Sequence, residues 1–244
     1  MVIEGIIAHE RVELLYQPLI DTKSGRMVGA EALVRSGVAR DGGALFARAN
    51  AAALGERLSR VVQRKALRAA AVWEGSLRNM PVSINLLPAD ISRPGYERWF
   101  LEEIDAVGID PRRVTLEITE SALLADHDSV AERLATLRAG GVRIAVDDFG
   151  TGYANLAYLT SFPLDVLKID QGLIANIVRR EHDRIVVKAL IRLARELDLK
   201  VVIEGVESAE QLALITEWGC DAYQGFLAAA ALTHEDLIRF ASAA

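Results

Sequence analysis

Short apolar runs alternate with amphipathic segments along most of the chain. The runs lie near residues 82–86, 113–118, 142–147, 166–169, 200–205 and 221–224. They are continuous rather than alternating, which is the pattern of strands that are covered on both faces. Apolar residues at helical spacing between the runs predict helices over residues 56–73, 94–107, 128–139 and 183–198, and another after Ser208. This order predicts a parallel sheet whose strands are connected by helices.

The first two strands are predicted to differ from the rest. The segments VELLYQPLID (12–21) and RMVGAEALVR (26–35) are separated only by the sequence TKSG. So short a link that contains glycine forms a hairpin, which makes the two strands antiparallel. With a length of 244 residues, the pattern predicts an α/β fold, a modified TIM (β/α)8 barrel with an antiparallel first strand.

Several residues mark where the helices begin. Pro94 is expected in the first turn of the helix over residues 94–107, and Asp183 is expected to open the helix over residues 183–198. Ser208 begins the sequence S-A-E-Q, which predicts a capping box. Thr233 is expected to cap the last helix.

A polar residue stands at or near the end of most of these apolar runs. A polar side chain at the end of a buried strand normally lowers stability, so its repetition indicates a function. Parallel strands that alternate with helices bring their carboxyl ends to one face of the barrel, where barrel enzymes have their active sites. The sequence therefore predicts one shared site formed by Glu31, Asn85, Glu117, Asp147, Lys168, Glu204 and Gln224.

Four of these residues carry the oxygen ligands that hard divalent cations prefer. Glu31, Glu117 and Asp147 offer carboxylates and Asn85 offers an amide oxygen, a set that suits Mg²⁺ or Mn²⁺ rather than zinc. Asp148 adds a carboxylate, and because the chain turns at a strand end, it can face the same site as Asp147. Two cations about 3.5–4 Å apart can then share Asp147, which is the geometry for in-line attack on a phosphate.

Each of these residues taken alone also has a structural explanation. Asn85 can favour a turn at the strand end, Glu117 can pair with an arginine across the barrel rim, and Lys168 can be a solvated lysine. All of these explanations would have to be true at once for the residues not to form a metal site. In addition, acids crowded at one rim repel one another strongly without a cation.

The glycine-rich run DDFGTGYANL (147–156) lies between a predicted strand and a short helix. It lacks both phosphate-binding patterns, GxxxxGK[ST] and GxGxxG. Gly150 and Gly152 suit either a mobile lid beside the metal site or a tight turn that requires positive φ.

Charge and composition exclude several kinds of partner. The net charge of −6 and the lack of a basic tract argue against a nucleic-acid duplex or an anionic membrane as the partner. No apolar run approaches the roughly 18 residues that a membrane span needs, and no signal peptide pattern is present, so we expect a cytoplasmic protein. A single cysteine, Cys220, permits no internal disulfide and is expected in the core.

Seven motifs resemble the EAL domain family of cyclic di-GMP phosphodiesterases. They are EALVR, SINLLP, LEITES, DDFGTGYANL, VLKID, IEGVE and YQGFL, in this order over residues 11–232. The resemblance implies a single EAL-type domain over residues 1–244 and metal-dependent hydrolysis of cyclic di-GMP to linear pGpG in bacterial signalling. It also implies activation by two Mg²⁺ or Mn²⁺ ions, a homodimer, and a sensor or GGDEF domain in the full-length protein. The larger Ca²⁺ ion is expected to bind and to inhibit.

The resemblance also implies a role for each matching residue. The first metal's ligands are matched by Glu31, Asn85, Glu117 and Asp147, and those of the second by Asp147 and Asp148. Lys168 matches the residue that holds the attacking water, Glu204 the general base or a second-metal ligand, and Glu120 the anchor of the DDFGTG loop. Contacts to the nucleotide or phosphate are expected from Gln17, Leu33, Arg35, Asp170, Glu207 and Gln224.

Two segments depart from the family pattern. Residues 36–55 lack the usual tryptophan and acid pair, and residues 227–232 read LAAAAL where the family often has a polar residue and proline. Both flank the expected ligand groove and concern guanine contacts rather than the metal ligands. The alternative function is a catalytically weak or inactive cyclic di-GMP receptor, but such receptors usually lack a strand-end acid or the DDFGTG loop, and this chain has all of them.

Overall fold

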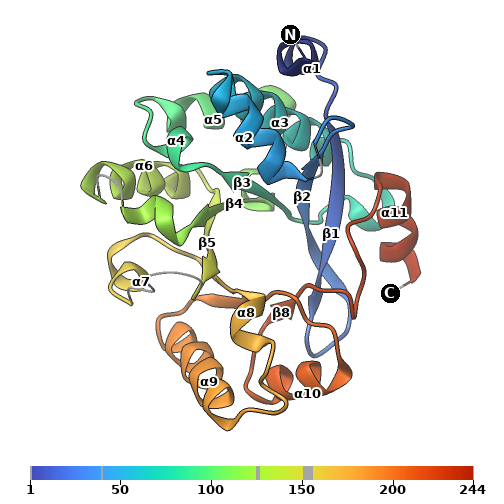
Figure 1. Cartoon of the computed structure of the whole chain (residues 1–244), viewed down its shortest axis with the longest axis vertical. Coiled ribbons are helices and arrows are strands. Elements are labelled where there is room, and N and C mark those ends of the chain that lie inside the picture. Colours follow the sequence, from blue (N-terminus) through green and yellow to red (C-terminus); the bar gives the residue numbers. More distant parts are fainter. Residues whose placement is uncertain (1, 40, 125–126, 151–155, 244) are drawn as a thin grey trace.

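The computed structural model describes residues 2–39, 41–124, 127–150 and 156–243 of the chain. Within these ranges, eight strands form one closed barrel in chain order (Figure 1). Their bounds are β1 Glu13–Asp21, β2 Met27–Arg35, β3 Val82–Leu86, β4 Val114–Thr119, β5 Arg143–Phe149, β6 Val166–Ile169, β7 Lys200–Ile203 and β8 Ala222–Tyr223. The prediction of a modified TIM barrel is therefore confirmed.

Strand β1 runs against both of its neighbours in the barrel. It pairs with β2 in antiparallel register and meets β8 antiparallel at Ile20 and Tyr223. All other adjacent strands, from β2 to β8, pair in parallel. In the β1–β2 hairpin, Asp21 Oδ1 accepts a 2.6 Å hydrogen bond from Ser24 N, and Gly25 has a φ of 68°. The short glycine-containing link thus produces the predicted reversal.

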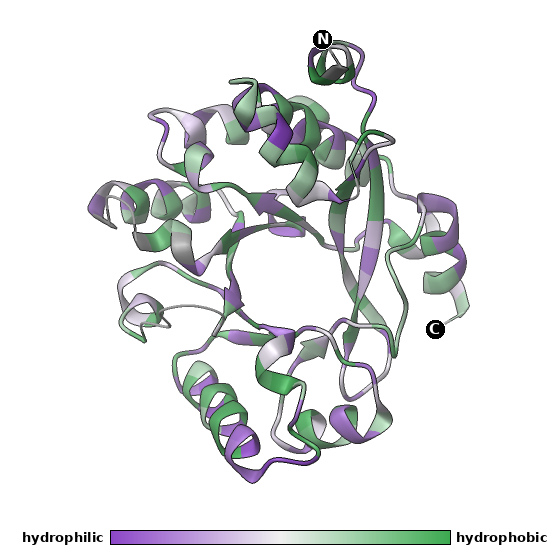
Figure 2. Ribbon diagram, in the orientation of Figure 1, coloured by the Kyte–Doolittle hydropathy of each residue, from purple (hydrophilic) through white to green (hydrophobic). Residues whose placement is uncertain are grey.

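Helices cover the outside of the barrel. The α-helices are α1 Val2–Ala8, α2 Gly42–Ala51, α3 Gly55–Ala71, α4 Pro88–Ile91, α5 Tyr96–Val107, α6 His127–Ala139, α7 Tyr158–Ser161, α8 Gln171–Ile174, α9 Glu181–Glu196, α10 Ala209–Glu217 and α11 His234–Ala243. The 3₁₀ segments are η1 Gly75–Leu77, η2 Pro111–Arg113 and η3 Glu120–Leu124. Figure 2 shows hydrophobic and hydrophilic stretches on the long outer helices, as expected for helices that pack one face on a sheet. None of the helices in the described part of the chain has the length and apolar composition needed to cross a bilayer.

The helix starts test the capping predictions. Ser208 Oγ accepts from Gln211 N while Gln211 Oε1 accepts from Ser208 N, so the capping box of α10 is confirmed. Thr233 Oγ1 accepts from Asp236 N at the start of α11, also as predicted. The placement of Pro94 in the first turn of α5 is wrong, because the N-cap residue Gly95 has a φ of 81° and the helix begins after it.

Two helices, α9 and α2, also differ from the prediction. The long helix α9 begins at Glu181, before the predicted start at Asp183. Helix α2 has no counterpart among the predicted helices, since its sequence is rich in alanine and only Leu45 and Ala49 on it are buried. Asp41 caps α2 by accepting a 2.8 Å hydrogen bond from Ala44 N.

Successive strand residues point alternately toward the helices and into the barrel. In β5, Ile144 belongs to the core between the sheet and the helices, whereas Ala145 packs inside the barrel with Val166, Val202 and Ala222. Residues two positions further along these strands point into the same interior, and they include the polar residues of the predicted site. Cys220 is buried, as expected for a core residue.

Candidate active site at the carboxyl end of the barrel

The polar residues of the predicted site come together inside the carboxyl end of the barrel. Strands β3 to β6 carry Asn85, Glu117, Asp147 and Lys168, while Glu204 and Gln224 directly follow β7 and β8. Glu31 differs in that it lies in the middle of β2, because β2 continues to Arg35 beyond its last pairing with β3 at Ala32. We call this group, together with Asp148, the rim cluster.

Lys168 occupies the centre of the rim cluster. Its Nζ lies 2.7 Å from Glu204 Oε1, 2.8 Å from both Glu117 Oε2 and Asp147 Oδ1, and 3.5 Å from Glu31 Oε2. The Lys168 side chain is only 1% exposed, so the interpretation of a solvated lysine is wrong. Glu117 pairs with this lysine rather than with an arginine. An ammonium group has three N–H donors, so it cannot satisfy four carboxylates fully.

Two amide side chains complete the network around Glu31. Asn85 Nδ2 donates to Glu31 Oε1 over 3.0 Å, and Gln224 Nε2 donates to Glu31 Oε2 over 2.9 Å. Gln224 Nε2 also lies 3.2 Å from Glu204 Oε1. Asn85 therefore does more than favour a turn, because its side chain holds a carboxylate of the cluster.

The adjacent residues Asp147 and Asp148 face one site because β5 is irregular there. The pairing of β5 with β6 shifts register between Val146 and Phe149, and Asp148 has a left-handed φ of 54°. Such a bulge re-aims a side chain that would otherwise point to the opposite face. Carboxylate oxygens of Asp147, Asp148 and Glu204 lie within 4.8 Å of one another, which is a spacing that a shared cation can span.

A cavity of about 300 Å³ opens beside the rim cluster. Of the residues expected to contact substrate, it is lined by Gln17, Leu33, Arg35, Glu207 and Gln224, and Glu204 lies in its wall. Arg35 currently donates through one guanidinium nitrogen to Val34 O over 2.9 Å. The cavity therefore places a guanidinium and a set of hydrogen-bonding groups next to the carboxylates.

Comparison with known proteins agrees with this geometry. The sequence model of the EAL domain family matches residues 3–231 of this chain. The chain belongs to the EAL domain family. It is 34% identical to the bifunctional diguanylate cyclase/cyclic di-GMP phosphodiesterase MucR of Pseudomonas aeruginosa, over 95% of this chain and 35% of that protein.

Solved structures of EAL proteins superpose over most of the chain. The MucR phosphodiesterase in complex with cyclic di-GMP has a TM-score of 0.88 at 31% identity and covers 97% of this chain and 100% of that one. Klebsiella pneumoniae BlrP1 with calcium and cyclic di-GMP has a TM-score of 0.83 at 30% identity, over 91% of this chain and 56% of that one. This EAL domain spans between 28% and 35% of the length of three curated relatives that it matches.

Charge crowding shifts the pKa values of the EAL domain's rim cluster. Burial, followed by repulsion from Glu31, raises the pKa of Glu117 well above its ordinary value. Burial also raises the pKa of Glu204 to about 7, against the opposing effect of Lys168. Burial lowers the pKa of Lys168, but the surrounding carboxylates outweigh it and hold that pKa well above its ordinary value. The cluster therefore has more negative charge than its single lysine can neutralise.

The donor set of this EAL domain fits divalent cations. In the described part of the chain, one ammonium group is surrounded by four carboxylates, those of Glu31, Glu117, Asp147 and Glu204, and the carboxylate of Asp148 lies beside them. Burying so many acids without matching positive charge is unfavourable. Oxygen-only ligands select hard ions such as Mg²⁺, Mn²⁺ or Ca²⁺. The rim cluster is thus suited to hold metal ions.

Two expected residues of the EAL motifs do not join this network in the described structure. Asp170 caps α8 by accepting a 2.7 Å hydrogen bond from Gly172 N, and it does not line the cavity. Glu120 is buried, and its Oε2 has no hydrogen-bond partner among the described residues. Its expected partner Thr151 lies outside those residues, so the loop-anchoring role stays a prediction.

Sequence reasoning missed five residues of the cavity wall, and two of them, Gln171 and Phe226, have large side chains. Gln171 lies beside the cavity after the end of β6, and Phe226 lies beside it after the end of β8. Phe226 is 72% exposed, which is unusual for a large aromatic residue. The signal that could have found Phe226 is its place two residues after Gln224, in the motif YQGFL.

The raised pKa of Glu204 gives a prediction for the metal-free EAL domain. In the unfolded chain Glu204 titrates near 4.5, below its folded pKa of about 7, so the folded state binds this proton more tightly. The resulting stabilisation is complete below the unfolded pKa and is lost as the pH rises through 7. With chelator present, raising the pH from 6 to 8 is expected to lower stability by roughly 1 kcal/mol and the melting temperature by about 2–4 °C.

Glu204→Gln is the control for this titration, because it cannot take up or release the proton. The variant should show a flatter dependence of melting temperature on pH than the unmodified protein. Identical pH profiles for the two proteins in chelator would contradict the assignment of this pKa to Glu204.

Proposed function

We propose that this EAL domain hydrolyses one phosphodiester bond of cyclic di-GMP to give linear pGpG, with Mg²⁺ or Mn²⁺ as the activating ion. The observation that carries the proposal is the complete rim cluster beside a cavity that contains Arg35. The solved MucR phosphodiesterase, in complex with cyclic di-GMP, is similar over its whole length, which supports the choice of substrate. Calcium and manganese in two BlrP1 complexes support the choice of ion class.

The proposed metal ligands follow the donor set. Glu31, Asn85, Glu117 and Asp147 would hold one ion, and Asp147 with Asp148 would hold the second. When bound, such ions lower the pKa of water from about 16 toward neutrality and offset charge on the phosphate. Asn85 would present its amide oxygen, while its nitrogen keeps Glu31 oriented as in the observed 3.0 Å hydrogen bond.

Lys168 and Glu204 have the proposed chemical roles. The Lys168 ammonium group would hold the attacking water and offset negative charge at the phosphate. Glu204, whose pKa of about 7 in the metal-free site is already close to the working pH, would accept the proton of that water. The water oxygen bonds to phosphorus as the bond to the leaving ribose oxygen breaks, and that oxygen then takes up a proton.

The cavity residues would bind and orient the substrate. Arg35 would break its hydrogen bond to Val34 O and instead donate hydrogen bonds from its guanidinium group to the phosphate. The remaining contacts to nucleotide or phosphate are proposed for Gln17, Leu33, Asp170, Glu207 and Gln224. Because the rim cluster is acidic, it repels the anionic substrate until metal is present, so metal should be required for substrate binding as well as for rate.

The test of the proposed function is hydrolysis of cyclic di-GMP with Mg²⁺, with Ca²⁺ and with chelator. We expect turnover to pGpG with Mg²⁺ or Mn²⁺ and none with chelator. Ca²⁺ tolerates longer and less regular bonds than Mg²⁺, so we expect it to permit binding and to inhibit cleavage. Full activity in Ca²⁺ alone would contradict this mechanism, and binding without turnover in Mg²⁺ would favour the receptor function instead.

The proposal also includes the context of the domain. We place the whole of residues 1–244 in one EAL-type domain that acts in the cytoplasm as a homodimer, where cyclic di-GMP signalling takes place. A GGDEF or sensor domain in the full-length protein is supported by the bifunctional name of the MucR relative and by the longer chains of the relatives. Light scattering of the isolated chain tests the dimer.

A further inference from the structure

The layer of side chains beneath the rim cluster is made mostly of small residues. Two positions before the rim residues on strands β3 to β8 stand Ser83, Thr115, Ala145, Val166, Val202 and Ala222. TIM barrels usually fill this interior with bulky branched side chains. Here the interior keeps a cavity of about 260 Å³, which these residues line.

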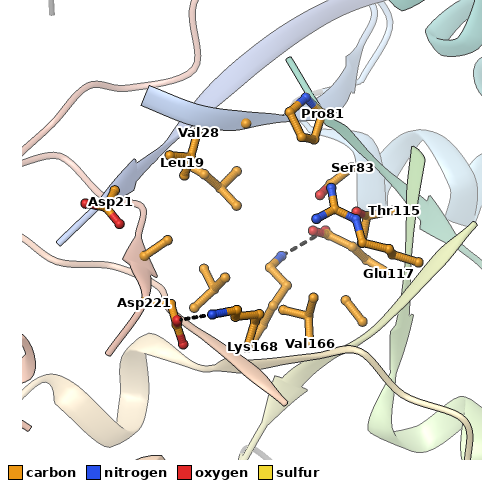
Figure 3. A pocket seen from close by; sticks show the side chains of 16 residues that line it. Leu19, Asp21, Val28, Pro81, Ser83, Thr115, Glu117, Val166, Lys168 and Asp221 are labelled. Carbon is orange, nitrogen blue, oxygen red and sulfur yellow. Dashed lines mark hydrogen bonds and ion pairs between the residues drawn. The ribbon is translucent and has the colours of Figure 1, made fainter. Parts of the chain in front are cut away.

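This cavity lies at the opposite end of the barrel from the substrate cavity. Its wall includes Arg143, Lys200 and Ala222, the first residues of β5, β7 and β8, and Asp21, the last residue of the reversed strand β1. Lys200 is 72% exposed and pairs with Asp221 at 2.8 Å, so the mouth opens to solvent. Figure 3 shows Leu19, Ser83, Thr115 and Val166 around this space, with the ion pair of Lys168 and Glu117 beside it.

Arg143 is a half-buried cation at the wall of this cavity, and the nearby carboxylate of Asp165 attracts its charge. Its guanidinium group makes no hydrogen bond or ion pair in the described part of the chain, and its Nε is fully buried without an acceptor. The nearby acid Asp165 is already engaged, since Oδ1 accepts from Arg138 Nε and Oδ2 accepts from Ile144 N. A buried polar group without a partner is costly, and burial lowers the pKa of Arg143 without discharging it.

Two hydroxyl groups lie in the same wall. Ser83 and Thr115 are buried side chains, and their hydroxyl groups have no hydrogen-bond partner among the described residues. Together with Arg143 they give this cavity N–H and O–H donors that the protein itself does not use. Such donors fit the oxygen atoms of an anion.

The rest of the wall is apolar or consists of charged groups that already have partners. Leu19, Val28, Val166 and Val202 supply hydrophobic surface. The acids Asp221 and Glu117 pair with Lys200 and Lys168, respectively. Asp21, the third acid of the wall, accepts hydrogen bonds from Ser24. Among the described residues of the wall, Arg143 is therefore the charged group that has neither a hydrogen bond nor an ion pair.

We infer that the amino end of the barrel is a second ligand site, for a small carboxylate with a compact apolar body. The carboxylate would accept hydrogen bonds from Arg143, Ser83 and Thr115, and the apolar body would pack against the aliphatic side chains. A single delocalised charge matches one guanidinium group, whereas a phosphate dianion would meet too little positive charge beside Asp21, Asp221 and Glu117. A cavity of about 150 Å³ is enough for benzene, so a substituted benzoate fits.

This site shares a wall with the proposed active site. Glu117 and Lys168 line the amino-end cavity and also belong to the rim cluster. A ligand bound in this cavity would therefore contact two residues of the rim cluster from the amino end of the barrel. Binding at the amino end does not depend on the proposed phosphodiesterase activity, and its test uses no turnover.

The test is ¹⁹F NMR titration of the metal-free protein in chelator with 4-fluorobenzoate. We expect saturable binding with a Kd on the order of 1 mM, as suits so small a ligand. Arg143→Met should weaken binding at least about 10-fold through loss of the charge-assisted hydrogen bonds. Ala145→Leu should abolish binding by filling the cavity, and Thr115→Val should weaken it at constant side-chain volume.

Two controls make the result specific. Arg192→Met removes an arginine that is 82% exposed on α9 and should leave the Kd unchanged. The neutral analogue 4-fluorobenzamide should bind at least about 10-fold more weakly than the carboxylate. No saturable binding by roughly 20 mM, equal binding of the amide, or an unchanged Kd in Arg143→Met would each overturn the inference.

Discussion

Replacing Asp147 with asparagine is expected to lower cyclic di-GMP turnover by at least about 100-fold. Substitution of groups that only support a metal ligand costs about 10–100-fold in metal affinity or activity, and Asp147 is proposed to contact both ions directly. Asparagine keeps the size of the side chain but removes the charge that neutralises the cations. The measurement is the rate of pGpG formation as a function of Mg²⁺ concentration.

The same substitution should not weaken the fold. Asp147 is one of four carboxylates around Lys168, so its loss reduces repulsion while the lysine keeps three partners. The melting temperature in chelator is therefore expected to stay equal or to rise. Asp105→Asn, at an exposed position on α5, controls for the chemical change itself. Near wild-type turnover in Asp147→Asn would show that the metal assignment is wrong.

The position of the rim cluster was predictable because strand order and hydrophobic pattern together determine it. Continuous apolar runs identified the parallel strands, and parallel strands place their ends on one face. Polar residues at those ends could therefore be assigned to one site from the sequence alone. Arg35 and Gln17 were assigned by resemblance, and both line the substrate cavity.

The local backbone around Asp148 was harder to predict. Two adjacent strand residues normally point to opposite faces, and the sequence does not encode the register shift that follows Val146. The carboxylates of Asp147 and Asp148 nonetheless lie close together, and the cause is a bulge with a left-handed residue inside β5. The strand continues to Phe149 instead of ending at Asp147.

The buried ammonium group could not be predicted from local sequence either. Lys168 lies in a short strand, and its burial depends on carboxylates that are 137 and 51 residues away in sequence, those of Glu31 and Glu117. The amino-end cavity could not be predicted from local sequence for the same reason, because it depends on small residues from six different strands. Helix α2 was missed because its stability comes from packing of Leu45 and from the Asp41 cap rather than from a periodic pattern.

Replacing Lys168 with methionine is expected to remove activity and also to destabilise the metal-free protein. Methionine keeps the aliphatic length of the side chain but leaves four buried carboxylates without a cation. Removing one partner of a buried ion pair typically costs about 3–5 kcal/mol. The loss should be largest at pH 8, where more of the carboxylates are ionised, and smaller at pH 6. Glu204 takes up a proton at the lower pH, because its pKa is about 7 with Lys168 present and rises further when the lysine is removed. Thermal unfolding in chelator at both pH values measures this.

Metal ions should restore part of the stability that Lys168→Met loses, because they replace the missing positive charge. Mn²⁺ is therefore expected to raise the melting temperature of the variant more than that of the unmodified protein, a readout that does not require turnover. Lys200→Met is the matched control, since Lys200 is 72% exposed and forms a single ion pair with Asp221. A variant at position 168 that is as stable in chelator as this control would show that the lysine does not offset the charge of the cluster.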